Sequence, residues 1–148
     1  MRAILIATDG SNGSDAAVAA GLELAGEFGA AVTFAYVRDP ISLLGEPYFQ
    51  EVLTTQQETA RTALAKAKAV GDAAGIATEG EILEGSPADA ILDLARARNV
   101  DLIVVGSRGR GAIAGALLGS TSTALVRRAD RPVLVVKEPA RTPVEASA

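Results

Sequence analysis

The sequence contains neither cysteine nor histidine, and aromatic residues make up only 3% of its 148 residues. Without cysteine there is no disulfide framework, no thiolate nucleophile and no zinc site built from thiolates. Without histidine there is no serine–histidine–aspartate triad, no histidine base and no imidazole metal ligand. These absences exclude most familiar hydrolase mechanisms, so we expect a protein that has no catalytic residues and no dedicated metal site.

Long hydrophobic runs are also missing. The longest uncharged stretch, residues 111–126, is interrupted by Gly, Ser and Thr and is flanked by arginines. This stretch is too short and too polar to cross a membrane. Residues 1–9 hold only a short apolar run, unlike the apolar region of a secretory signal. We therefore expect a cytoplasmic protein that does not associate with membranes.

The net charge of −4 is unevenly distributed along the chain. Residues 1–100 carry 7 basic and 14 acidic side chains, whereas residues 101–137 carry 6 basic and 2 acidic ones. A local basic segment in an acidic protein argues against nucleic-acid binding and favours attraction of a small anion at one place. The alternative is that the arginines form a solvated face, and charge alone does not decide between the two. These arginines are Arg108, Arg110, Arg127, Arg128 and Arg131.

Apolar runs alternate with helical patterns along the chain. Strands are predicted at residues 2–8, 31–37, 78–83, 101–106 and 132–137, and helices at 15–28, 49–74, 86–99 and 119–129. This alternation is typical of an α/β fold with a mostly parallel sheet and helices on both faces. We predict one domain over residues 1–137, followed by a C-terminal tail at 138–148.

Two local details of these helices are predicted as well. In the long helix, a period of 3.6 residues puts Val52, Gln56, Thr59, Ala63 and Ala67 on one face. In the helix that follows, Ser86 is placed to cap the N-terminus and Pro87 to occupy the first turn.

A glycine-rich segment follows the fourth predicted strand. Five glycines, at positions 106, 109, 111, 115 and 119, lead into Ser120, Thr121 and Ser122 at a predicted helix N-terminus. Glycines allow backbone N–H groups to converge on an anion, and a helix N-terminus adds free donors and a favourable dipole. The alternative is a flexible loop with a helix cap. Because the glycines directly follow an apolar strand inside the only basic stretch, the pattern favours phosphate binding.

Two common phosphate motifs do not explain this segment. The pattern GxxxxGK[ST] fails because no lysine follows these glycines. A GxGxxA match at Gly109, Gly111 and Ala114 lies after the fourth strand, whereas the dinucleotide fingerprint opens the first βα unit.

The spacing Gly106-x-x-Gly109, nine residues, then Gly119-Ser120 resembles that of the universal stress protein family. Asp9 after the first strand and the PVLVV run near the end add to the resemblance, which covers residues 1–137 and is strongest for the ATP-binding branch. The resemblance implies a Rossmann-like, five-stranded parallel sheet of order 3-2-1-4-5. The ligand would lie where the strand order reverses, between the first and fourth strands.

The resemblance also implies a set of residues that contact the nucleotide. Asp9 would bond the ribose or the adenine and Val37 would flank the base, although Asp9 read by itself is equally suited to a helix cap or a turn. The implied set runs from the adenosine end to the phosphate chain: Ala7, Thr8, Asp9, Val37, Val105, Gly106, Arg108, Gly109, Gly119, Ser120, Thr121 and Ser122.

The function that these features favour is a non-catalytic stress or regulatory protein that binds ATP, with or without Mg²⁺, and hydrolyses it slowly at most. A cyclic AMP sensor or sink, or an AMP-binding protein, remains an alternative because the glycine loop suits one phosphate as well as three. A nucleotidyl- or phosphotransfer enzyme is disfavoured by the lack of histidine. Since an apolar edge strand would promote aggregation, we also expect a homodimer through Val133–Val136.

Overall fold

The computed structural model describes residues 1–38, 48–109 and 118–138. Most of the loop that Pro40, Gly45 and Pro47 predict at Arg38–Tyr48 (39–47), part of the glycine-rich segment (110–117, with Gly111 and Gly115) and most of the predicted tail (139–148) lie outside the described residues. The elements alternate as predicted: β1 Ala3–Ala7, α1 Asn12–Phe28, β2 Ala31–Arg38, α2 Tyr48–Ala73, β3 Thr78–Glu84, α3 Pro87–Ala97, β4 Leu102–Gly106, α4 Ser120–Arg128 and β5 Val133–Val136.

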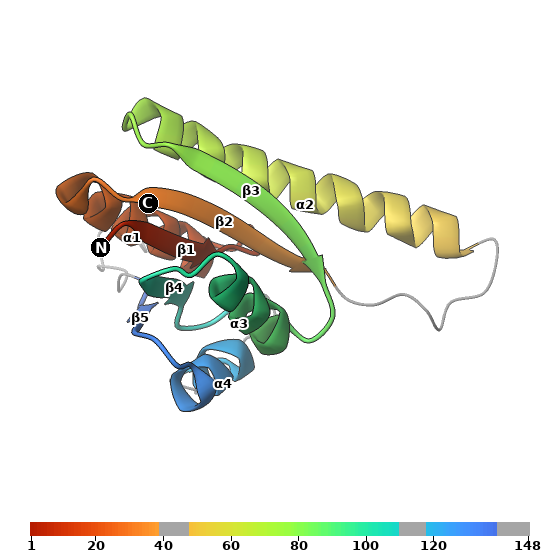
Figure 1. The fold of residues 1–148 in the computed structure, drawn as a ribbon. Helices are drawn as coiled ribbons and strands as arrows, with labels where there is room; N and C mark the ends of the chain where they lie inside the picture. Colours follow the sequence, from red (N-terminus) through yellow and green to blue (C-terminus); the bar gives the residue numbers. More distant parts are fainter. Residues whose placement is uncertain (39–47, 110–117, 139–148) are drawn as a thin grey trace, which may run out of the picture.

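The five strands form one parallel sheet of order β3-β2-β1-β4-β5, as predicted (Figure 1). β1 lies at the centre, where Ile6 is in register with Phe34 of β2 on one side and with Val104 of β4 on the other. The chain reverses its direction across the sheet between β1 and β4. In open parallel sheets this point leaves a crevice beyond the carboxyl ends of the strands.

Side chains of the central strands alternate between two helical layers. Ile4 and Ile6 of β1 pack in a cluster with α1 and α2, whereas Leu5 and Ala7 pack with α3 and α4. The three central strands β1, β2 and β4 are almost wholly buried because helices cover both faces. This arrangement confirms the predicted three-layer architecture.

Helix α1 begins at Asn12, three residues before the apolar period predicted at 15–28. Ser11 is the N-cap, and its hydroxyl oxygen accepts a hydrogen bond from the Ser14 N–H. A turn and a helix start are expected at residues 9–11, directly after the first strand, and the cap at Ser11 confirms this; only the apolar period begins later, because the first turn carries polar and glycine residues. In α3, Ser86 is the N-cap and Pro87 occupies the first turn, as predicted, but the Ser86 side chain makes no capping hydrogen bond.

Helix α2 buries the face predicted for it in its middle turns but not in its first turns. The buried stripe consists of Ala60, Ala63, Ala67 and Gly71. Ala63 and Ala67 were predicted correctly, but Val52, Gln56 and Thr59 are only partly buried. The first turns of α2 lie near the carboxyl end of the neighbouring strand β3 (Figure 1), so their inward face borders a cavity rather than the sheet.

A close backbone approach joins α1 to β4. A β-carbon on Gly106 would lie 2.8 Å from the carbonyl oxygen of Gly13, and one on Gly13 would lie 2.5 Å from the carbonyl oxygen of Arg108. Both distances are shorter than a real β-carbon tolerates. Glycine at both positions therefore lets the first turn of α1 sit against the end of β4.

The edge strand β5 is held by a side chain from the turn before it. One Nη atom of Arg131 donates 2.9 Å hydrogen bonds to the carbonyl oxygens of Ala95 and Val100 at the end of α3. Arg131 therefore stabilises the fold. It does not belong to a solvated basic face, the alternative considered for the arginines of this segment. Within the described part of the chain, no helix is both long and apolar enough to cross a membrane.

Candidate functional site

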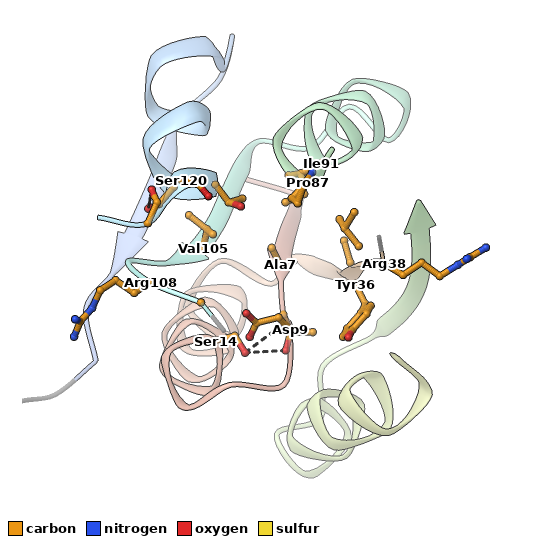
Figure 2. A pocket seen from close by; sticks show the side chains of 18 of the residues that line it. Ala7, Asp9, Ser14, Tyr36, Arg38, Pro87, Ile91, Val105, Arg108 and Ser120 are labelled. Carbon is orange, nitrogen blue, oxygen red and sulfur yellow. Dashed lines mark hydrogen bonds between the residues drawn. The ribbon is translucent and has the colours of Figure 1, made fainter. Parts of the chain in front are cut away.

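A cavity of about 610 Å³ opens at the carboxyl end of the sheet, beside the reversal between β1 and β4 (Figure 2). Its volume is within the range of small-molecule and cofactor sites. The cavity brings together every residue that the sequence implicated: Ala7, Thr8, Asp9, Val37, Val105, Gly106, Arg108, Gly109, Gly119, Ser120, Thr121 and Ser122.

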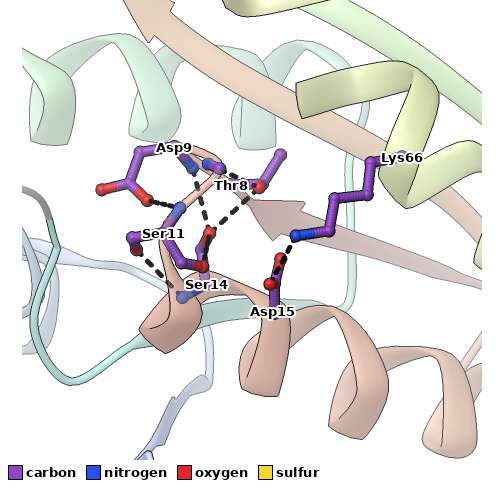
Figure 3. A network of polar contacts seen from close by, with 7 residues as sticks. Thr8, Asp9, Ser11, Ser14, Asp15 and Lys66 are labelled. Atoms are coloured by element: carbon purple, nitrogen blue, oxygen red, sulfur yellow. Dashed lines mark hydrogen bonds and ion pairs between the residues drawn. The ribbon is translucent and has the colours of Figure 1, made fainter. Parts of the chain in front are cut away.

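The floor of the cavity is the turn between β1 and α1, which is ordered by one hydroxyl group (Figure 3). The Ser14 hydroxyl donates to the Ser11 carbonyl at 3.0 Å and accepts from the Asp9 N–H at 3.3 Å. Since its single hydrogen is used in this way, the 3.1 Å contact with Thr8 requires the Thr8 hydroxyl to be the donor. Thr8 and Ser14 are both buried, so this network is shielded from water.

The Asp9 carboxylate lies at the mouth of this turn. Its Oδ1 accepts the Ser11 N–H at 2.9 Å, which makes Asp9 a turn residue, while Ser11 rather than Asp9 caps α1. Its Oδ2 lies beside Gly109, on the loop that follows β4. The turn alternative considered for Asp9 is therefore correct, and the same carboxylate also lines the cavity.

Helix α4 begins at the opposite wall. Gly119 is its N-cap. The first hydrogen bond of the helix runs from the Thr123 N–H to the Gly119 carbonyl, at 3.0 Å. The N–H groups of Ser120, Thr121 and Ser122 precede that bond, so the helix backbone itself does not satisfy them. Three donors and the positive end of the helix dipole meet at the cavity wall, an arrangement suited to an anion.

The Ser122 hydroxyl has a structural role. Its single hydrogen is shared between the Ser107 carbonyl at 2.9 Å and the Gly119 carbonyl at 3.1 Å, and the Gly119 N–H donates to the Ser107 carbonyl at 2.6 Å. These bonds fasten the start of α4 to the end of β4. An anion at this wall would meet the backbone N–H of Ser122 rather than its hydroxyl hydrogen.

The arginines of the basic segment do not converge on the cavity. Arg108 lines it, but Figure 2 shows its side chain directed outward, and the residue is exposed. Arg128 forms an ion pair with Asp89 of α3, and Arg127 is exposed on α4. Arg110 lies outside the described residues. In the part of the chain that the structure describes, the anion-binding features are thus backbone donors more than guanidinium groups.

Two further walls of the cavity, one apolar and one polar, complete its lining. Val37 and Val105 were predicted, and the structure adds Pro87 and Ile91 of α3 to form the apolar wall. The polar wall comes from α2 and β2, and it was missed entirely: Tyr36, Arg38, Thr55, Gln56 and Thr59.

Of the lining residues that the sequence analysis missed, one could have been found from a local pattern and the others could not. Ser14 follows Ser11 at the three-residue spacing of a helix cap directly after a strand, and this signal was available. The residues of α2 carry no comparable motif. Their place in the cavity depends on how α2 is rotated and how far it extends past the sheet, which local sequence does not specify.

Residues suited to a metal ion are sparse. Among residues 1–38, 48–109 and 118–138, no three acidic side chains cluster closely enough to hold a cation. Asp9 is the acidic residue among those lining the cavity.

The fold and the cavity define a class of protein: an open parallel α/β domain with a cavity at its switch point and a helix N-terminus on the cavity wall. The model of the universal stress protein family matches residues 1–137. The chain therefore belongs to the universal stress protein family.

Relatives from distant organisms support this assignment. A universal stress protein of Thermus aquaticus is 38% identical over 138 residues, which cover 92% of this chain and 98% of the relative. One from Methanocaldococcus jannaschii is 36% identical over 139 residues, covering 92% of this chain and 82% of the relative.

Solved structures show the same fold. The universal stress protein UspA of Lactobacillus plantarum superposes with a TM-score of 0.83 at 26% identity, covering 91% of this chain and 97% of that one. A universal stress protein solved in complex with cAMP has a TM-score of 0.70 at 29% identity, covering 93% of this chain and 98% of that one.

Proposed function

We propose that this protein binds ATP in the cavity at the carboxyl end of the sheet and acts as a nucleotide-responsive stress or regulatory protein. The observation that carries the proposal is the convergence of all twelve implicated residues, from four separate parts of the chain, on one cavity. Mg²⁺ would accompany the phosphate chain, with phosphate oxygens as its main ligands and Asp9 as the one carboxylate at hand.

The chemistry of the walls supports a nucleotide. The N-terminus of α4 offers three backbone donors to phosphate oxygens, and Gly106 and Gly109 add no side chain to the cavity lining beside it. The apolar wall, with Val37 and Ile91, is suited to cover a planar base. Asp9 lies between the two ends, where a carboxylate can accept hydrogen bonds from ribose hydroxyls.

A second candidate ligand is cyclic AMP. It is favoured by one specific observation, the structural neighbour solved in complex with cAMP at 29% identity. The N-terminus of α4 would serve a single phosphate as well as a chain of three, so the same residues support both ligands. AMP is a further alternative on the same grounds, and a nucleotidyl- or phosphotransfer activity is a weaker one.

We further propose that the protein is not an enzyme in the ordinary sense and that any ATP hydrolysis is slow. The chain has no histidine or cysteine, and the Asp9 carboxylate already accepts the Ser11 N–H, which holds it in the turn. We expect phosphate release well below about 1 s⁻¹, the lower end of ordinary enzyme turnover. A faster rate that depends on Asp9 would contradict this part of the proposal.

The decisive experiment is calorimetric titration of the full chain with ATP, ADP, AMP and cyclic AMP, each with and without Mg²⁺. The wild type should bind ATP, and Gly109→Trp should lose binding because its indole would fill the space between Asp9 and the start of α4. Circular dichroism checks that the variant is folded. Tighter binding of cyclic AMP than of ATP would favour the second candidate, and a folded wild type that binds no nucleotide would refute the proposal.

We propose in addition that the protein forms a homodimer through β5. This strand is at the edge of the sheet and its four residues are half-buried. The carbonyls of Pro132 and Val136 accept from Ile103 and Ser107 of β4, so the backbone groups of Val133 and Val135 face the open edge. An open row of this kind readily pairs with a second copy of the same strand.

The substitution Val135→Pro tests the dimer without breaking the sheet of one protomer. Proline would remove an outward-facing N–H and leave the β4–β5 ladder intact. Light scattering coupled to gel filtration should show a dimer for the wild type and a monomer for the variant. A monomeric wild type, or a variant that is still dimeric, would show that β5 is not the interface.

A further inference from the structure

A buried polar atom on the wall of the cavity has no partner. The side-chain oxygen Oε1 of Gln56 is buried, and no donor within hydrogen-bond distance of it is found in the described structure. Gln56 lies on α2 and lines the cavity. A buried carbonyl oxygen without a donor costs about 1–3 kcal/mol, so such an atom beside a cavity points to a donor on the ligand.

The two threonines and the arginine of this wall already have partners within the protein. The Thr59 hydroxyl donates to the Thr55 carbonyl at 2.9 Å, and the Thr55 hydroxyl donates to the Glu51 carbonyl at 3.1 Å. Arg38 is paired with Glu84 at 2.8 Å, and Figure 2 shows its side chain directed away from the cavity. Gln56 is therefore a polar group whose hydrogen bonding the protein leaves incomplete.

The topology places Gln56 at the end of the cavity opposite the anion-binding wall. The strand order puts β2 on one side of β1 and β4 on the other, and α4 starts from the β4 side. Helix α2 packs on β2 through Ala60 and Ala63, which contact Tyr36. Gln56 lies one turn before Ala60 on the same face of α2. With the phosphates at the N-terminus of α4, the base must extend toward β2 and α2.

We infer that Gln56 recognises the hydrogen-bonding edge of the nucleotide base and selects a purine that carries an amino group at C6. This inference rests on the proposed nucleotide binding. The Gln56 oxygen accepts from that amino group, while the side-chain amide donates to the adjacent ring nitrogen. A carboxamide matches the adenine edge in this bidentate way, as glutamine and asparagine do when they read adenine in DNA.

A thermodynamic cycle tests the contact directly. ATP and purine riboside triphosphate, which lacks the amino group, are titrated into the wild type and into Gln56→Leu. The wild type should bind ATP about tenfold more tightly than the analogue. This is the expected effect of losing a hydrogen bond and leaving a buried acceptor without a donor. In Gln56→Leu this preference should disappear. If the preference is unchanged in the variant, or absent from the wild type, the inference is wrong.

A second variant reverses the pattern of acceptors. Gln56→Glu replaces the amide donor by a second acceptor, which suits the N1–H and amino group of guanine better than the adenine edge. The ratio of ATP to GTP affinity should fall by about tenfold or more, since both hydrogen bonds change. This variant is nearly isosteric, so it also serves if Gln56→Leu fails to fold. An unchanged ratio would overturn the inference.

The neighbouring glutamine provides a matched control. Gln57 is on the same helix and is partly buried, but it does not line the cavity. Gln57→Leu should keep the wild-type preference for ATP over the deaminated analogue. If the wild type binds ATP but Gln56→Leu and Gln57→Leu behave alike, the inference falls and the proposed function stands. If the wild type binds no nucleotide, both fall.

Discussion

Gly109 lies directly against the carboxylate of Asp9. A β-carbon at position 109 would be only 2.5 Å from Oδ2 of Asp9, although the two residues come from loops that follow different strands, β4 and β1. The other carboxylate oxygen of Asp9, Oδ1, accepts a hydrogen bond from the Ser11 N–H. The carboxylate therefore cannot move away from position 109 without breaking this bond of the turn. A glycine at position 109 thus preserves the position of the carboxylate within the cavity.

This contact predicts that Gly109→Ala weakens nucleotide binding without unfolding the protein. The added methyl group would displace the Asp9 carboxylate from its place, and one charge-assisted hydrogen bond to the ligand would be lost. We expect the dissociation constant for ATP to rise about tenfold, which corresponds to about 1.4 kcal/mol. Calorimetry measures the affinity and thermal unfolding measures the stability. Wild-type affinity in a folded variant would contradict the geometry.

A glycine elsewhere supplies the control for this substitution. Gly26 is in α1, and a β-carbon there would meet no other atom within 4 Å. Gly26→Ala should stabilise the protein by about 0.5–1 kcal/mol, because alanine loses less backbone entropy than glycine in a helix. Chemical unfolding should show this gain with unchanged ATP affinity. A loss of stability would mean that the glycine has a role that the structure does not show.

The opposite result is expected at the other end of the same helix. A β-carbon on Gly13 would lie 2.5 Å from the Arg108 carbonyl, which belongs to the backbone and cannot rotate aside. Gly13→Ala should therefore destabilise the fold by about 1–3 kcal/mol, the usual cost of overpacking. Urea unfolding of this variant beside Gly26→Ala separates the steric effect from helix propensity. Equal stability of the two variants would refute the close approach.

The buried hydroxyl of Ser14 predicts a loss of stability on Ser14→Ala. This substitution removes the acceptor for the Asp9 N–H and the donor to the Ser11 carbonyl. Ser14 is 5% exposed, so water cannot replace these bonds freely. We expect a loss of about 1–3 kcal/mol, together with weaker ATP binding because the Asp9 turn loosens. Both are measured on one sample by unfolding and calorimetry.

An exposed serine provides the comparison for Ser14→Ala. Ser86 makes no side-chain capping bond at the N-terminus of α3, so Ser86→Ala should change the free energy of unfolding by less than about 0.5 kcal/mol. If both serine variants lost the same stability, the loss at Ser14 could not be assigned to its hydrogen bonds.

Acid should weaken the connection between the N-terminus and the start of β4. The N–H groups of Arg2 and Ala3 donate to the Asp101 carboxylate at 2.6 and 3.0 Å, and these bonds lower the pKa of Asp101 in the folded state. The unfolded chain therefore binds the proton more readily. The stabilisation is fully present above the ordinary aspartate pKa of about 3.9, and it is lost as the pH falls through the lower folded value.

The measurement compares the wild type with Asp101→Asn in urea at pH 7 and pH 3. The variant should be less stable than the wild type at pH 7, and the difference should narrow at pH 3, because there the unfolded wild-type chain binds a proton at Asp101 more readily than the folded chain does. Because Asp101 is exposed to solvent, the effect should be modest. A gap that widens in acid would contradict the sign of the pKa shift.

The local elements could be predicted because their signals are local. The apolar runs at β1 and β4 and the glycine stops after the helices follow from residue order alone. The cap of α1 at Ser11 agrees with the turn and helix start expected after the first strand, although the first turn gives no apolar period. On the predicted face of α2, Ala63 and Ala67 are buried, whereas Gln56 and Thr59 are partly buried and line the cavity.

The sequence by itself determined the alternation of strands and helices and the cluster of glycines at one strand end, because short-range sterics and hydrophobic period set both. It also pointed to the end of the cavity where α4 begins, since backbone donors at a helix N-terminus require only glycines and a helix start. Tertiary structure alone decided which residues line the opposite end. Gln56 reaches that end only because α2 packs on β2 and extends beside the cavity, and this placement depends on long-range packing that no local pattern encodes.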